Sequence, residues 1–122
     1  MTHRDPGEQR PLGATEFHVL LVLLDGPQYG YAIMKAVEEE SGGRISPEIG
    51  SLYRLLARLA SDGLVEEAPA PRGVAVSHPG RDRRYHRLTA RGRATVGVEA
   101  RRLREVVQLA VARAVLPARS RS

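Results

Sequence analysis

The segment SPEIGSLYRLLARLASDG (residues 46–63) contains the pattern that decides the fold. Apolar residues recur in it at spacings of three and four, which is the repeat of one face of an α-helix. These core candidates are Ile49, Leu52, Leu56 and Leu59. The opposite side presents Ser51, Arg54 and Arg58 at the same spacing. The sequence therefore predicts a helix with one apolar face and one polar, basic face.

Both ends of this helix are marked by residues with a preference for helix termini. Ser46-Pro47 predicts its start, because a serine hydroxyl can cap free backbone N–H groups and proline fits the first helical position. Asp62-Gly63 predicts its end, because glycine readily adopts the left-handed conformation that closes a helix.

Two more helices are predicted upstream. Residues 14–24 carry a broad apolar surface at helical spacing, which is typical of a helix packed between partners. Its members are Phe17, Val19, Leu20, Leu21, Leu23 and Leu24. Asp25-Gly26-Pro27 should end this helix. A second helix is predicted over residues 29–41, with Ile33, Met34 and Val37 directed inward, and Gly42-Gly43 should end it.

Downstream, the pattern changes to short strands. Residues 64–68 and 83–88 are predicted to form a hairpin, joined by a segment rich in proline, glycine and arginine. Thr89 is predicted to cap a final helix that ends at Pro117. The fold class is therefore mainly α with a small β-hairpin, and the order of elements is that of a winged helix-turn-helix.

The chain divides into one domain, one long helix and two short ends. Residues 1–12 contain almost no apolar side chains, so we expect them to contribute nothing to a packed core and to form a flexible arm. Residues 13–88 form the predicted winged helix-turn-helix domain, residues 89–117 the C-terminal helix and residues 118–122 a disordered tail.

The C-terminal helix carries a seam that resembles a coiled coil, because its apolar residues alternate at four and three. The seam consists of Val96, Ala100, Leu103, Val107, Ala110 and Ala114. These residues could pack against the chain's own first helix. The apolar surface is wider than one small domain should bury, however, and exposed apolar surface of this size usually marks an interface. We therefore expect a homodimer that also involves Phe17 and Leu21 of the first helix.

Composition narrows the classes of partner. A net charge of +5 and a pI near 10.4 favour a polyanion, either nucleic acid or an acidic membrane surface. The chain has no cysteine, which excludes disulfides and thiolate metal sites. No stretch approaches the roughly 20 apolar residues that a membrane-spanning helix needs. We expect a cytoplasmic protein without a membrane partner.

Nothing in the sequence predicts catalysis or a cofactor. The four histidines lack the spacing of metal ligands, and no nucleophile motif surrounds the serines. We expect a protein that is not an enzyme and that holds neither a metal nor a cofactor.

The predicted architecture instead indicates that the protein binds double-stranded DNA. In a helix-turn-helix protein the recognition helix enters the major groove, and the wing reaches neighbouring phosphates or the minor groove. The residues expected to contact DNA are Lys35, Glu48, Ser51, Tyr53, Arg54, Arg58, Arg81, Arg83 and Arg84. Ser51, Arg54 and Glu48 are assigned to base edges, and Tyr53 lies beside the apolar stripe, so packing is an equal alternative for it.

Three linked motifs resemble the PadR family of transcriptional regulators. They are LLVLLDGPQYGYAIMKAVEEESGG, SPEIGSLYRLLARLASDGLVEE and RDRRYHRLTARGR, and the resemblance covers roughly residues 14–105. It implies that the second motif contains the recognition helix and that the last helix forms the dimer. With one C-terminal helix, the chain resembles the short-chain subgroup. Some members of that subgroup bind flat aromatic drugs between tryptophans, and this chain has none.

The residue pattern predicts a homodimer that binds a palindromic operator, and the resemblance alone implies that the protein is a repressor. The resemblance also implies a small-molecule effector site at the dimer interface, between the first and last helices near Phe17. The alternative is a winged-helix module that binds another protein and has no specific hold on DNA.

Overall fold

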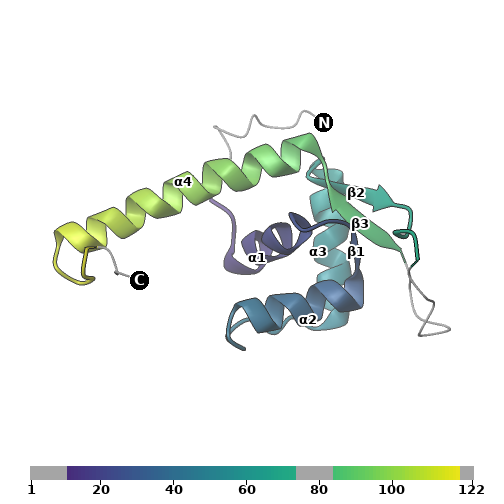
Figure 1. Cartoon of the computed structure of the whole chain (residues 1–122), viewed down its shortest axis with the longest axis horizontal. Coiled ribbons are helices and arrows are strands. Elements are labelled where there is room, and N and C mark those ends of the chain that lie inside the picture. Colours follow the sequence, from purple (N-terminus) through teal and green to yellow (C-terminus); the bar gives the residue numbers. More distant parts are fainter. Residues whose placement is uncertain (1–10, 74–83, 119–122) are drawn as a thin grey trace.

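The computed structural model describes residues 11–73 and 84–118. It has four helices and a small antiparallel sheet, which confirms the predicted mainly α, winged helix-turn-helix architecture (Figure 1). In chain order the elements are α1 (Ala14–Leu23), β1 (Gln28–Tyr29), α2 (Gly30–Glu40), α3 (Ile49–Ser61), β2 (Val65–Ala68), β3 (Tyr85–Leu88) and α4 (Ala90–Ala112).

The core lies between α1, α2, α3 and the first half of α4. The most deeply buried large apolar side chains come from the first three helices and include Leu20, Leu23, Ile33, Leu52, Leu56 and Leu59. Helix α1 contacts both α2 and α4, as its broad apolar surface predicts. Leu12 also packs against this core, so the expectation that residues 1–12 contribute nothing to it is wrong at that position. Residues 1–10 and 119–122 lie outside the described residues.

Helix α3 begins later than predicted. Its N-cap is Glu48 and its first residue Ile49, so Ser46 does not cap it. The Ser46 hydroxyl instead donates a hydrogen bond of 2.6 Å to Glu38 of α2. Ile49, the first residue of α3, is 38% exposed, so the prediction that it belongs to the core is wrong. Leu55 occupies the core together with the three predicted leucines.

The end of α3 follows the prediction. Gly63 has a φ of 77°, and the Leu64 N–H donates to the Leu59 carbonyl at 2.9 Å. This is the hydrogen bond that closes a helix through a left-handed residue. The turn sends the chain directly into β2.

The sheet has one strand more than the predicted hairpin. Strand β3 lies between β2 and β1, and Tyr29 of β1 pairs with Tyr85 of β3. The two rings meet edge to face with their centroids 5.5 Å apart. A strand of two residues is too short to show an alternating pattern in the sequence, which is why β1 was not predicted. Its pairing with β3 stabilises it.

Helix α4 starts as predicted and stops early. Thr89 accepts a hydrogen bond from the Gly92 N–H at 2.9 Å and donates one to the Gly63 carbonyl at 2.6 Å. The helix ends at Ala112 and not at Pro117. The chain turns at Ala114, whose φ is 61°, and the Val115 N–H donates to the Ala110 carbonyl at 3.0 Å. Ala114 is therefore not part of the helical seam.

Among the residues that the structure describes, only the first half of α4 packs deeply on the other elements. Its buried residues are Gly92, Thr95, Val96 and Glu99, and the helix then runs past α1 and away from the domain (Figure 1). Within residues 11–73 and 84–118, no helix combines the length and apolar character needed to span a bilayer.

Candidate nucleic-acid interface

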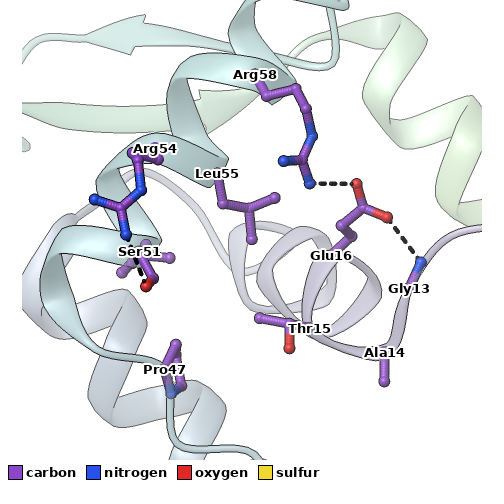
Figure 2. A pocket seen from close by; sticks show the side chains of 10 residues that line it. Gly13, Ala14, Thr15, Glu16, Pro47, Ser51, Arg54, Leu55 and Arg58 are labelled. Carbon is purple, nitrogen blue, oxygen red and sulfur yellow. Dashed lines mark hydrogen bonds and ion pairs between the residues drawn. The ribbon is translucent and has the colours of Figure 1, made fainter.

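The outward face of α3 presents the residues that the sequence assigned to base reading. Ser51 and Arg54 are exposed, and Arg54 Nη2 donates to Ser51 Oγ at 3.1 Å. Figure 2 shows the two side chains meeting along α3, with Pro47 before the helix. Glu48 is exposed at the N-cap. The opposite face is buried in the core, so the polar face is the side of α3 that is available to a groove.

Arg58 extends from α3 toward α1, away from Arg54 (Figure 2). Its Nη2 donates to Glu16 Oε2 at 2.9 Å, and the Arg58 side chain is 55% exposed while that of Glu16 is 10% exposed. The other oxygen of Glu16 accepts the Gly13 N–H at 2.7 Å. One carboxylate thus joins the start of α1 to the recognition helix.

These side chains line a hollow of about 480 Å³ between α1 and α3. Its polar lining includes Thr15, Ser51, Arg54 and Arg58. Hydroxyl and guanidinium groups are donors suited to phosphate oxygens. Glu16 was not among the predicted site residues. Its spacing of three from Gly13 is that of a helix-capping pair and was the available signal.

Tyr53 packs against the N-terminal turn of α2. A Cβ added to Gly30 would lie 2.6 Å from Tyr53 Cε1, so glycine at this position allows the ring to approach. The Tyr53 side chain is half-buried and contacts the core cluster. The packing role is present in the structure, and contact between its hydroxyl and DNA stays a prediction.

The remaining predicted DNA contacts lie on α2 and at the wing. Lys35 is exposed on α2, with its Nζ 5.8 Å from the centre of the Tyr31 ring. Arg84 is exposed immediately before β3. Arg81 and Arg83 fall outside the described residues. Arg87 of β3, which was not among the predicted contacts, pairs with Glu66 at 2.8 Å across the sheet.

The predicted dimer seam separates into two parts. Val96 is 5% exposed within the chain's own core, so assigning it to the dimer interface was wrong. Phe17 and Leu21 are half-buried and also pack against that core. Ala100 is exposed, and Leu103 and Ala110 are partly buried. The large exposed apolar residues of the C-terminal region are Val106, Val107, Leu109, Val115 and Leu116.

Between these two parts, Glu99 is almost completely buried and paired with Arg102. Arg102 donates from Nη2 at 2.6 Å and from Nε at 3.1 Å to the two oxygens of the carboxylate. The hydrogen bond to Glu99 raises the pKa of Arg102 above its usual range. The pair compensates the charge of a carboxylate that would otherwise be costly to bury. In the described part of the chain, no group of three or more His, Cys, Asp or Glu side chains is arranged to hold a metal ion.

Comparison with curated proteins finds a relative in Streptomyces fradiae, described as an uncharacterized 37.1 kDa protein in transposon TN4556. The two are 46% identical over 67 residues. The match covers 52% of this chain and 19% of the relative, so this chain spans about a fifth of that protein's length.

Solved structures share the fold. A PadR-like transcription factor from Bacteroides fragilis has a TM-score of 0.60 at 28% identity, over 77% of this chain and 84% of that chain. Bacillus subtilis PadR in complex with operator DNA has a TM-score of 0.56 at 21% identity, over 71% of this chain and 46% of that chain. The family model described as the transcriptional regulator PadR-like family matches residues 19–97. Because that match spans more than half of the sequence, the chain belongs to the transcriptional regulator PadR-like family.

Proposed function

We propose that this protein is a sequence-specific DNA-binding repressor that acts as a homodimer on a palindromic operator. The observation that carries the proposal is the division of α3, which buries Leu52, Leu56 and Leu59 and leaves Ser51 and Arg54 exposed. A helix anchored along one face and polar along the other is what major-groove recognition requires. The B. subtilis relative was solved with operator DNA, which supports the same use here.

The proposed DNA contacts are of two kinds, contacts to bases and contacts to phosphates. Arg54 would donate to guanine, with Ser51 and Glu48 beside it, because an arginine fork matches the two acceptors of that base. Lys35, Arg84 and the Tyr53 hydroxyl would hold phosphates, and we assign Arg58, Arg81 and Arg83 to the same task. Phosphate contacts supply affinity on any sequence, whereas base contacts decide which sequence is preferred.

The second half of α4 would pair with a second copy of the chain. Val106, Val107 and Leu109 are each about half exposed, on a helix that has left the body of its own domain. Burying such residues between two copies removes apolar surface from water. A two-fold dimer would place two α3 helices roughly one turn of DNA apart, which is why the operator should be palindromic.

Two finer points follow from this assignment. An effector site at the dimer interface would lie near Phe17 and Leu21, whose side chains are half-buried on α1. The compartment would be the cytoplasm, where a regulator meets bacterial chromosomal DNA. A screen of aromatic compounds for a rise in Tm would detect such an effector.

The test compares Arg54→Ala with Arg104→Ala. Both remove one exposed arginine, but Arg104 lies on α4, away from the recognition helix. Fluorescence anisotropy should measure both variants on DNA from upstream of the protein's own gene and on an unrelated duplex. Arg54→Ala should lower the affinity for the upstream DNA about tenfold and the affinity for the unrelated duplex much less. Equal losses on both duplexes, or no wild-type preference between them, would count against base reading by α3.

A further inference from the structure

The ion pair between Glu16 and Arg58 presents a problem for a DNA-binding surface. It places a negative charge next to an arginine at the edge of the recognition helix, where a DNA backbone would repel a carboxylate. Yet Glu16 is nine-tenths buried and accepts hydrogen bonds on both oxygens, from Gly13 and from Arg58. A carboxylate fixed in this way cannot turn away, so its effect on Arg58 is built into the fold.

The geometry of the pair leaves Arg58 able to bind a second anion. Glu16 takes one N–H of Nη2, and a guanidinium has five N–H donors. More than half of the Arg58 side chain remains exposed, at the rim of the hollow that Ser51 and Arg54 also line. A phosphate approaching α3 from the α1 side therefore meets a guanidinium whose position is already set by its pairing with Glu16.

We propose that Glu16 is a positioning residue for DNA binding: it holds the Arg58 guanidinium in place so that its other donors engage a backbone phosphate on the α1 side of α3. The proposal rests on the proposed function and adds to it a residue that does not touch DNA. An unpaired arginine loses side-chain freedom when it binds, and that loss lowers affinity. Because Glu16 already orders the Arg58 side chain when the protein folds, Arg58 loses less freedom when it binds DNA.

Three effects of Glu16→Gln can be separated by the sign of the change in affinity and by whether that change depends on Arg58. The substitution keeps the shape and an acceptor for Gly13 but raises the net charge by one unit. If Glu16 only neutralises Arg58, every duplex should bind more tightly. If Glu16 only supports the start of α1, binding should weaken whether or not Arg58 is present. If Glu16 positions Arg58, binding should weaken only while Arg58 is present.

The experiment is a double-substitution cycle on the full-length protein. Glu16→Gln, Arg58→Ala and the pair together are titrated with a mixed-sequence duplex of about 30 base pairs at several KCl concentrations, and Tm is recorded for each. We expect the affinity for the duplex to fall about threefold in Glu16→Gln and about tenfold in Arg58→Ala. Arg58→Ala should also lower the salt slope by about 0.9, the value for one phosphate contact. Glu16→Gln should cause no loss in the Arg58→Ala background.

Two further variants keep the test decisive. Glu66→Gln makes the same charge change in an exposed ion pair on the wing, and it should bind at least as tightly as the wild type. Arg58→Gln replaces Arg58→Ala if the alanine variant unfolds, since glutamine can still donate to the buried carboxylate. Binding by Glu16→Gln as tight as wild type, or equal losses in both backgrounds, would overturn the proposal. A wild type that binds no duplex would instead overturn the proposed function, and this inference with it.

Discussion

Gly92 of α4 lies directly against the backbone carbonyl of Leu64, at the point where the C-terminal helix begins. A Cβ built on Gly92 would overlap the Leu64 carbonyl oxygen and would also meet the Leu88 side chain at 3.0 Å. The same carbonyl accepts the Thr89 N–H at 3.1 Å. Glycine thus allows the first turn of α4 to lie against the backbone of Leu64, the residue before β2.

Gly92→Ala should therefore destabilise the protein although alanine favours helix. The overlap involves backbone, which cannot rotate away, and overpacking of this kind costs about 1–3 kcal/mol. Gly97→Ala is the matched control, because its added Cβ would meet only Arg101 Nη1, at 3.7 Å. In this control the free energy of unfolding should rise by up to about 1 kcal/mol, because alanine has a higher helix propensity than glycine. Urea unfolding at one protein concentration measures both, and a stabilised Gly92→Ala would contradict the close contact.

Val107→Glu should weaken the proposed homodimer. Val107 is 49% exposed on the half of α4 that leaves the domain, and a carboxylate placed there would be buried without a partner in both copies. The expected loss is tenfold or more in dimer affinity, which corresponds to about 1.4 kcal/mol or more. Light scattering over a range of concentrations measures it. Gln108→Glu adds the same charge to a polar neighbour and should remain dimeric.

If Val107→Glu stayed dimeric, the interface would have to lie elsewhere on the chain. A wild type that is monomeric at micromolar concentration would argue against this use of α4 altogether.

Arg84→Ala should weaken binding to all duplexes by a similar factor. Arg84 is exposed at the start of β3 and is assigned to a phosphate, so its loss should lower the salt slope by about 0.9 without changing sequence preference. Anisotropy titrations at several KCl concentrations give the slope, with Arg104→Ala as the control for the loss of one positive charge. An unchanged salt slope would show that Arg84 does not contact a phosphate.

Local signals in the sequence predicted most of the helices and their ends. Gly63 closes α3 and Thr89 caps α4 as expected, because both act on backbone groups within a few residues. The Ser46-Pro47 start was wrong because a tertiary partner, Glu38, took the serine hydroxyl. Propensity for a cap is a local preference that such a contact can override.

Contacts between distant parts of the chain could not be predicted. Glu16 and Arg58 are 42 residues apart, and the two residues of β1 are ordered by pairing with β3. The seam of α4 shows a related difficulty. Val96 and Val107 share one helical period, but only the first half of the helix reaches the core, so periodicity alone could not separate own-chain packing from an exposed face.

In the proposed function, the α3 helices of two copies of the chain each read one half of an operator. Sequencing genomic fragments captured by the purified protein tests it most directly. We expect an enriched inverted repeat whose half-sites are centred roughly 10 base pairs, or one turn, apart, and we expect Arg54→Ala to reduce the enrichment. Fragments without a shared motif, or a motif that Arg54→Ala captures as well as the wild type does, would contradict it.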